Sequence, residues 1–341
     1  MEKKINSFLL VLFSSILLLF SCSKNPITTH LTNSDTTTSA DSTTTTIDVK
    51  QLKYLCIYYG WPSLVNGSNG DLTKATQSFE QFDLIVLGDG IWKADNADNA
   101  NTTTIIGNLN LVGKTVYGYV DLGVSTQNLS YENMKLAVDG WKSMGAKGIF
   151  WDDAGYDYST TRARQDTMIN YCHAKGLSVI MNAWTPADVL GGDNVLLDST
   201  DTYLLESYLV SSNKYSSLTA WQSKASACAA YQSSLGVKMA CLSSSDATIT
   251  STYNTTDMFT QAWIGAAIYN FDYFQLTDNN YSASNNIVYY FPNISDNYGS
   301  TWTSSTVADS ANVNFYRSTE TSTLHVRGDG SSWGYGQILQ P

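Results

Sequence analysis

The chain has 341 residues and is acidic, with a formal net charge of -11 and a pI of about 4.6. This balance argues against binding to DNA, RNA or another polyanion through the overall field of the protein. Only 14% of the residues are charged, whereas the chain contains 22 Tyr and 9 Trp. Surfaces rich in aromatic and neutral polar side chains are common in secreted proteins that handle neutral sugars.

Residues 1–22 have the pattern of a lipoprotein signal peptide. Lys3 and Lys4 precede an apolar run from Phe8 to Phe20, which is too short to span a membrane comfortably. The run leads into Leu-Phe-Ser-Cys, which resembles a lipobox, so we expect Cys22 to be lipidated and to become the mature N-terminus. An ordinary signal peptide with an incidental cysteine is the alternative. We expect a protein that is lipid-anchored to the cell envelope and faces the extracytoplasmic side, or that is secreted.

Residues 23–48 are rich in Thr, Ser, Asn and Asp and contain few apolar residues. Such a segment cannot bury enough surface to offset the entropy lost on ordering. The composition predicts a disordered tether between the lipid and a folded domain.

Four further cysteines are Cys56, Cys172, Cys228 and Cys241. They lack the C-x-x-C spacing that is typical of zinc sites. An even count permits disulfides outside the cytoplasm, with three possible pairings. Since three of the four lie in apolar strand-like or helical segments, we expect buried free thiols.

Short apolar strands alternate with amphipathic helices from about residue 52. Near-continuous apolar runs are expected of parallel strands that are covered on both faces. The predicted strands are Tyr54–Tyr59, Asp83–Gly88, Thr115–Asp121, Gly148–Asp152, Leu177–Asn182, Tyr203–Tyr208, Val237–Leu242 and Ala267–Phe274. Among the predicted helices, one begins after the capping residue Ser130 and another spans about 160–175.

Eight strand-then-helix units predict an α/β fold, a (β/α)8 TIM barrel over residues 49–284. A doubly wound open sheet is the alternative, but no Gly-rich phosphate-binding fingerprint follows the first strand. Residues 285–341 are rich in Asn, Ser, Thr and Tyr. Alternating stretches at Asn312–Tyr316 and Thr323–Arg327 predict a small β-rich C-terminal appendage there.

Chemistry in a TIM barrel takes place at the C-terminal ends of the strands. The predicted strand ends carry carboxylates and aromatic residues but neither cysteine nor histidine. His30, His173 and His325 fall in the tether, a helix and the tail. No Ser-His-Asp or Cys-His system and no histidine-based metal site is easily assembled from this pattern.

Carboxylates without histidine suit glycoside hydrolysis. One ionised carboxylate attacks the anomeric carbon, stabilises it or activates water, and a second, protonated carboxyl group donates a proton to the leaving oxygen. Asp152 and Glu206 lie two strands apart, within catalytic reach across a small barrel. We therefore expect Asp152, Glu206 and Asp153 to be catalytic. The expected substrate contacts are Tyr58, Trp61, Trp92, Asp121, Asn182, Trp184, Tyr208 and Asp272.

Each of these residues also has a purely structural interpretation. Asp152, Asp153 and Asp121 can cap the loops that follow their strands, and Asp272 can pair with a neighbour at the rim. The aromatic side chains pack more often than they bind sugar. Glu206 is a charge within an apolar strand, and such a residue is rarely buried without a reason.

The motif Tyr117–Gly123, then a helix carrying Trp141, then Gly148–Asp153 resembles the spherulin-like and endo-α-1,4-polygalactosaminidase-like glycoside hydrolases, families 114, 135 and 166. The resemblance covers roughly residues 54–275. It implies a TIM barrel that cleaves exopolysaccharides containing galactosamine or N-acetylgalactosamine. It also implies that Asp152 is the nucleophile and Glu206 the general acid/base, with Asp153 at the position of the neighbouring acidic residue.

Two departures from the family pattern bear on the substrate. The residue at position 153 is Asp where the spherulin-like group usually has Glu, and Asn182-Ala183-Trp184 stands where relatives often have Asn-Pro-Gly. Both leave the catalytic pair intact.

The leading hypothesis is an endo-acting glycoside hydrolase with a polysaccharide substrate. We expect no cofactor, no metal and no nucleic acid partner, a membrane contact through the N-terminal lipid only, and a monomer. The alternatives are a non-catalytic carbohydrate-binding surface lipoprotein on the same scaffold and a structural envelope protein.

Overall fold

The computed structural model describes residues 47–246 and 257–340, which belong to one compact unit. The predicted signal peptide, Cys22 and nearly all of the predicted tether lie outside these residues. Within the described residues, no helix has the length and apolar character needed to cross a membrane.

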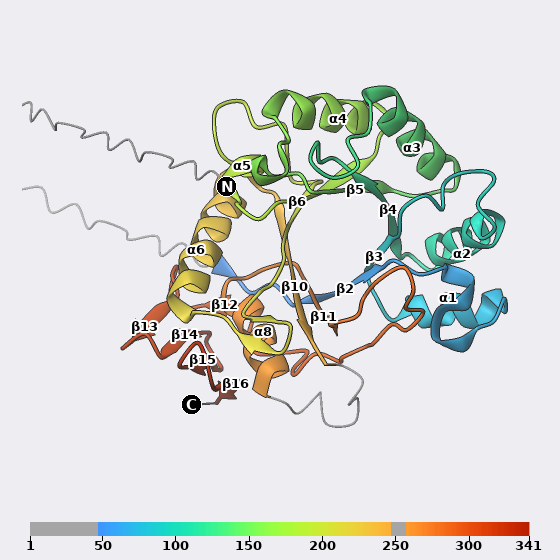
Figure 1. Ribbon diagram of the computed structural model, residues 1–341. Helices are drawn as coiled ribbons and strands as arrows, with labels where there is room; N and C mark the ends of the chain where they lie inside the picture. The colour runs from blue at the N-terminus through green and yellow to red at the C-terminus, as the bar shows by residue number, and fades with distance from the viewer. Residues whose placement is uncertain (1–46, 247–256, 341) are drawn as a thin grey trace, which may run out of the picture. The chain divides into compact units, whose positions relative to one another are not determined.

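Eight parallel strands close into a barrel in chain order (Figure 1). Its strands are β2 (Lys53–Tyr58), β3 (Leu84–Leu87), β4 (Thr115–Asp121), β5 (Gly148–Asp152), β6 (Ser178–Asn182), β7 (Thr202–Leu205), β10 (Lys238–Ser245) and β11 (Tyr273–Asp278). β11 closes the barrel by pairing with β2, where Tyr273 lies opposite Lys53. The TIM-barrel prediction is confirmed.

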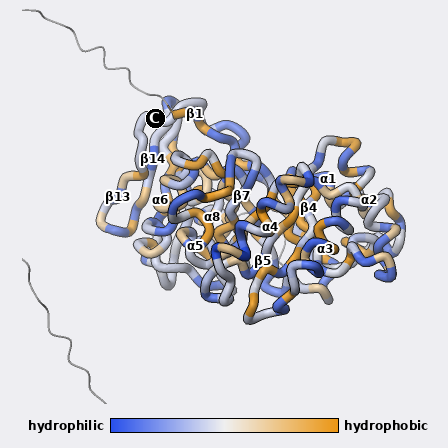
Figure 2. The backbone as a smooth tube through the Cα atoms, turned by 90° about the horizontal axis from the view of Figure 1, so that it is seen from above, coloured by the Kyte–Doolittle hydropathy of each residue, from blue (hydrophilic) through white to orange (hydrophobic). Residues whose placement is uncertain are grey.

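The apolar strands fill two compartments, since alternate side chains of a strand point to opposite faces. One set fills the inside of the barrel, and the other packs under the helices. The inner set is Leu55, Ile57, Leu84, Val86, Tyr117, Phe150, Ile180, Leu204, Ala240 and Leu242. Figure 2 shows hydrophobic positions concentrated along strands such as β4 and β5. Burial on both faces explains why these strands lack a polar alternation.

Helices surround the barrel (Figure 1). They are η1 (Pro62–Gly67), α1 (Leu72–Glu80), α2 (Asn99–Leu111), α3 (Tyr131–Ser143), η2 (Tyr156–Tyr158), α4 (Arg162–Ala174), α5 (Ala187–Leu190), α6 (Leu218–Leu235) and α8 (Asp257–Ile268). The side chain of Ser130 accepts a hydrogen bond from the Asn133 amide at the start of α3, as predicted. The four cysteines of the described chain, Cys56, Cys172, Cys228 and Cys241, are buried free thiols.

The predicted strand Ala267–Phe274 is wrong. α8 continues to Ile268, and β11 begins only at Tyr273. α8 is buried along nearly its whole length, because the barrel covers one side and the C-terminal sheet covers another. A helix that is apolar all round resembles a buried strand in sequence. The correction moves Asp272 from the interior of a strand to the position just before β11.

A four-stranded antiparallel sheet follows the barrel. It consists of β13 (Ala308–Ser310), β14 (Asn314–Ser318), β15 (Thr323–Gly328) and β16 (Gly334–Leu339). The sheet contacts α8 through a 3.0 Å hydrogen bond from the Gly336 amide to Thr260 Oγ1 and a 2.8 Å bond from Gln261 Nε2 to the Arg327 carbonyl. The predicted β-rich appendage is therefore present and packs directly on a barrel helix.

Two small antiparallel pairs complete the structure. β1 (Ile47–Asp48) pairs with β12 (Thr301–Trp302), so these two residues, which the sequence assigned to the tether, take part in the fold. β8 (Val210–Ser211) and β9 (Lys214–Tyr215) form a short hairpin between β7 and α6. This hairpin follows Glu206 and shapes one side of the barrel mouth.

Candidate active site

The polar residues of the site come from neighbouring barrel strands at the same end. Asp121 ends β4 and lies opposite Asp152, the last residue of β5, in the parallel register. Asn182 is the last residue of β6, and Glu206 directly follows β7. The C-terminal ends of parallel barrel strands meet at one mouth. The sequence-predicted carboxylates are therefore brought together.

Asn182 joins the two principal carboxylates. Its Nδ2 atom donates a hydrogen bond of 2.9 Å to Asp152 Oδ1 and one of 3.3 Å to Glu206 Oε2. Two oxygens that share one donor at these distances lie no more than about 6 Å apart. Asn182 was predicted as a substrate contact, and the structure places it as the amide that spaces the carboxylates.

Tyr281, which the sequence analysis did not single out, holds the other oxygen of Glu206. Its hydroxyl donates a 2.8 Å hydrogen bond to Glu206 Oε1. The Tyr281 ring stacks on Tyr59, with ring centroids 5.8 Å apart, and Tyr59 meets the ring of Tyr119 edge-on. Three tyrosine rings thus form a wall beside the carboxylates and restrict the rotamers of Tyr281 and Glu206.

The environment of Asp152 favours its neutral form. Burial, and after it the negative charges of Asp153 and Glu206, raise its pKa to about 7. A hydrogen bond from Tyr119 acts in the opposite direction without cancelling the effect. The site therefore holds a proton near neutral pH, where an ordinary aspartate would have lost it.

Asp153 and Asp121 form a second carboxylate pair beside the first. Burial, and then the charge of Asp121, raise the pKa of Asp153 to about 6. Thr126 Oγ1 donates a 2.8 Å hydrogen bond to Asp121 Oδ1. Asp153 also has a φ of 53°, in the left-handed region that costs a residue with a side chain energy. Such strain is characteristic of functional sites.

Two tryptophans near the mouth expose their rings. Trp61, which follows β2, is 45% exposed, and Trp184, which follows β6, is 56% exposed. The Lys224 ammonium lies 3.8 Å from the centroid of the Trp184 ring and donates a 2.9 Å hydrogen bond to its carbonyl. Exposed, orientated indoles can stack on sugar rings, so these two predicted contacts remain open to substrate.

Three predicted aromatic contacts take part in packing. Tyr58 is buried and donates its hydroxyl hydrogen to the Trp61 carbonyl. Tyr208 is buried, and its hydroxyl donates a 2.8 Å hydrogen bond to the Gly265 carbonyl of α8. Trp92 lies against Gly140 of α3, where a Cβ atom would clash with its ring. Tyr58 and Tyr208 are thus buried, whereas Trp92 is half-buried.

Asp272 lies at the opposite end of the barrel, so the structure does not bring it to the site. Its carboxylate forms a 2.9 Å salt bridge with Lys50 and accepts hydrogen bonds from Gln232 Nε2 and the Met239 amide. The cause is the position of β11, which begins after Asp272 rather than ending near it. Asp272 anchors the N-terminal ends of neighbouring strands.

Among the described residues, one group has the geometry of a metal site: His173, Asp198 and Asp201, whose ligand atoms lie within 4.8 Å of one another. The Asp201 carboxylate already accepts hydrogen bonds from the amides of Val179 and Asp198, and it contacts His173 Nε2 at 3.0 Å. These bonds tie the start of β7 to α4, which explains the cluster as a structural network at the end opposite the carboxylates.

Fold and site together define a TIM barrel whose C-terminal mouth carries a cluster of half-buried and buried carboxylates. No family model and no curated protein matches the chain. Among solved structures, the glycoside hydrolase domain of PelA from Pseudomonas aeruginosa is 11% identical, with a TM-score of 0.43 over 69% of this chain and 99% of that one. An α-amylase from Geobacillus thermoleovorans with acarbose is 8% identical, with a TM-score of 0.46 over 84% and 96%.

Barrels of other activities match at the same level. A D-allulose 3-epimerase from Methylomonas sp. is 12% identical, with a TM-score of 0.40 over 67% of this chain and 84% of that one. Similarity at this level says nothing about activity, so a functional conclusion depends on the site itself.

Proposed function

We propose that the protein is an endo-acting glycoside hydrolase, anchored to the cell surface through Cys22, that cleaves an exopolysaccharide containing galactosamine or N-acetylgalactosamine. The observation that carries this proposal is the hydrogen bonding of one Asn182 amide to both Asp152 and Glu206. A half-buried carboxylate pair at fixed separation is the machinery that glycoside hydrolysis needs.

The separation supports a retaining mechanism. Retaining enzymes place their two carboxyl groups about 5–5.5 Å apart, whereas inverting enzymes leave about 6.5–9.5 Å for a water molecule. The shared amide of Asn182 keeps the nearest oxygens of Asp152 and Glu206 within about 6 Å. A limit of about 6 Å on the nearest oxygens favours the retaining spacing over the inverting one.

The reaction then proceeds in two balanced steps. The reactive form of the pair carries one proton, and that proton is on Glu206: the Asp152 carboxylate attacks the anomeric carbon while Glu206 gives the proton to the glycosidic oxygen, so that the leaving sugar departs as an alcohol. In the second step Glu206 takes a proton from water, and the resulting hydroxide displaces Asp152 from the anomeric carbon. Asn182 and Tyr281 hold the two carboxylates in place throughout.

The resemblance to the spherulin-like and polygalactosaminidase-like hydrolases supplies both the division of roles and the amino-sugar substrate. The exposed rings of Trp61 and Trp184 support binding of a sugar chain that extends across the mouth. An endo mode of cleavage requires a site that is open at both ends, and these indoles follow different strands, β2 and β6.

Product analysis tests this proposal. We expect the full chain to convert galactosaminogalactan into a ladder of oligosaccharides, seen by mass spectrometry, rather than into monosaccharides. Proton NMR of the first products should show the anomeric configuration of the substrate. Release of monosaccharides alone would contradict endo cleavage, and the opposite anomer would contradict the retaining mechanism.

A further inference from the structure

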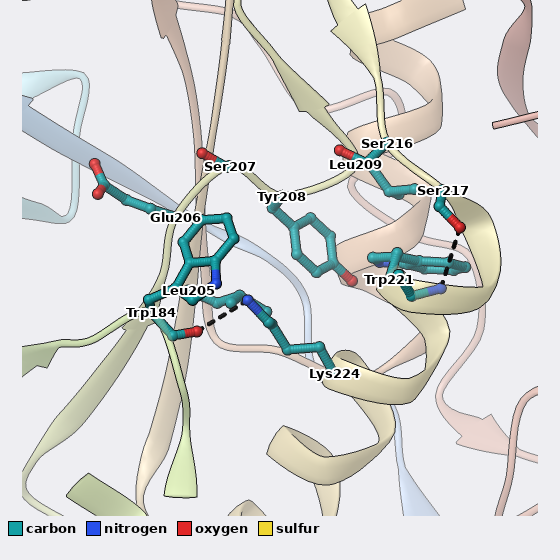
Figure 3. Close-up of a pocket in the computed structure, with 11 residues that line it drawn as sticks. Trp184, Leu205, Glu206, Ser207, Tyr208, Leu209, Ser216, Ser217, Trp221 and Lys224 are labelled. Atoms are coloured by element: carbon teal, nitrogen blue, oxygen red, sulfur yellow. Dashed lines mark hydrogen bonds between the residues drawn. The ribbon is translucent and has the colours of Figure 1, made fainter. Parts of the chain in front are cut away.

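A pocket with about 130 Å³ of accessible space opens directly beside Glu206. It lies between Trp184 and the start of α6 (Figure 3). In Figure 3 the carboxylate of Glu206 points away from Tyr208 and Trp221, which stand on the other side of the pocket. The pocket is lined by Trp184, Leu205, Glu206, Ser207, Tyr208, Leu209, Ser216, Ser217, Ala220, Trp221 and Lys224. The pocket shares Glu206 and Trp184 with the proposed function, and its remaining lining residues have no role in the reaction steps.

The walls of the pocket are mainly apolar. Trp184 forms one wall, while Tyr208 and Trp221, whose rings meet edge-on, form another. Lys224 is the one cation of the lining, and its ammonium is held against the Trp184 ring and carbonyl. A space with this lining favours a small group that is apolar apart from a neutral hydrogen-bonding atom.

The backbone that shapes the pocket is strained and firmly held. Ser207 and Leu209 have φ values of 54° and 58°, which are unfavourable for residues with side chains. Tyr208 between them is fixed by its amide, which donates to the Leu242 carbonyl at 2.9 Å, and by a hydrogen bond from Ser243 Oγ to its carbonyl. Strain that the surrounding structure maintains marks segments whose shape matters for function.

The glycine at position 265 makes this shape possible. A Cβ atom on Gly265 would clash with the Leu209 side chain and would crowd the rings of Trp221 and Tyr208. The back wall of the pocket therefore depends on a close approach between α8 and the loop after β7. The pocket is a built feature of the fold rather than a gap between mobile loops.

We propose that this pocket receives the acyl group of an acylated sugar unit, an acetyl on nitrogen or oxygen, next to the bond that is cleaved. This inference rests on the proposed function and specifies its substrate. The methyl group would contact the apolar walls, and the carbonyl would face Lys224 or the serines. A free ammonium group at the same place would be repelled by Lys224, and any charged group would lose its hydration against the apolar walls.

Ala220 allows the pocket to be filled without disturbing the core. It is exposed on α6 and lines the pocket, so Ala220→Leu extends a side chain into the space where the acyl group would lie. Ala227→Leu is the matched control, because Ala227 is an exposed residue of the same helix outside the lining. Leucine is a good helix former, so both variants should fold normally.

Calorimetric titration of full-length protein with N-acetylgalactosamine oligomers and with the same oligomers after N-deacetylation tests the inference. All proteins carry Asp152→Asn so that the ligand is not consumed. Burial of one methyl group predicts about fourfold tighter binding of the acetylated oligomer. Ala220→Leu should abolish this preference, and Ala227→Leu should preserve it. O-acetylated oligomers, before and after mild alkali, distinguish the ester from the amide.

Equal affinity for the two oligomers, no binding of either, or equal effects of the two leucine variants would overturn the pocket assignment. Failure of the proposed function gives a different pattern. An acetyl preference that Ala220→Leu removes, without release of reducing ends by the wild-type chain, would leave the pocket in place and reject the hydrolase. Cleavage of acetylated and deacetylated polymers at equal kcat/KM would support the hydrolase and reject the pocket assignment.

Discussion

The Tyr281 hydroxyl donates a 2.8 Å hydrogen bond to the Glu206 carboxylate, although the two residues are 75 positions apart in the chain. Tyr281 follows β11, the strand that closes the barrel, so closure of the fold also completes the site. The stacked ring of Tyr59 leaves Tyr281 little freedom to turn away. Tyr281 therefore acts as a positioning residue for Glu206.

Substitution of Tyr281 by Phe should lower kcat about 10- to 100-fold, with little change in KM. Loss of a hydrogen bond to a charged group costs about 1.5–3 kcal/mol, and the ring retained in Phe preserves the stacking on Tyr59. Steady-state kinetics on a soluble oligosaccharide measures the effect. Tyr316→Phe, in the C-terminal sheet, is the control and should match wild type. An unchanged kcat for Tyr281→Phe would reject the positioning role.

Azide rescue should separate the roles of the two carboxylates. In Asp152→Ala, azide takes the place of the nucleophile, so we expect a glycosyl azide of inverted anomeric configuration. In Glu206→Ala, azide attacks the glycosyl-enzyme ester, so we expect the retained configuration. NMR of the azide products is the measurement. The opposite assignment of anomers would exchange the two roles, and no rescue of either variant would argue against a covalent intermediate.

The pH dependence of kcat/KM should follow the ionisation of Asp152. The nucleophile acts only when ionised, and burial together with the charges of Asp153 and Glu206 raises its pKa to about 7. The acid limb of the profile is therefore expected near pH 7, well above the ordinary aspartate value of 3.8. Asp153→Asn removes one of these charges and should move this limb to lower pH.

Asp95→Asn changes an exposed carboxylate and serves as the control for that experiment, with no expected movement of the limb. An acid limb near pH 4 in the wild-type chain would contradict the proposed environment of Asp152. A limb near pH 7 that stays in place in Asp153→Asn would show that the charge of Asp153 does not contribute.

The same groups should make the fold less stable as the pH rises. Asp152 and Asp153 have pKa values of about 7 and about 6 in the folded chain, above the ordinary value of 3.8. The folded state thus keeps protons that the unfolded chain has released. The contribution of these two groups to the free energy of unfolding is complete below about pH 4 and is lost as the pH rises through 6 and 7.

Asp152→Asn removes the buried charge, so it should raise the free energy of unfolding by about 2–4 kcal/mol at about pH 8 and change it little at about pH 4. Denaturant unfolding at the two pH values measures this difference. An equal effect at both pH values would show that charge is not the cause. Higher stability with lost activity would be the expected trade-off at a strained site.

Much of the barrel could be predicted from sequence because seven of its strands are short apolar runs whose polar ends are distinct. Asp121 and Asp152 are the final residues of such runs, so their common location followed from the geometry of parallel strands. Asn182 was found for the same reason, but its bonds to two carboxylates depend on side-chain distances that no sequence pattern contains.

The prediction of the eighth strand is wrong, and two errors at the site follow from it. α8 is apolar on nearly every side because it lies between the barrel and the C-terminal sheet, so its end has the sequence pattern of a buried strand. Asp272 was then placed at the mouth, and Tyr281 was missed because it fell beyond the expected strand. Tyr208 is a different case, because it lines the pocket beside Glu206 instead of the open mouth. Its place after Glu206 was correct, but the turns at Ser207 and Leu209 direct its ring inward.

The most direct test of the account is release of reducing ends from galactosaminogalactan and poly-N-acetylgalactosamine by the wild-type chain, Asp152→Asn and Glu206→Gln. We predict release by wild type and a loss of about 10³-fold or more in each variant, because each removes one half of the catalytic pair. Thermal unfolding of the same samples verifies that both variants are folded. Activity that survives in either folded variant, or absence of release by wild type on both polymers, would contradict the central claim.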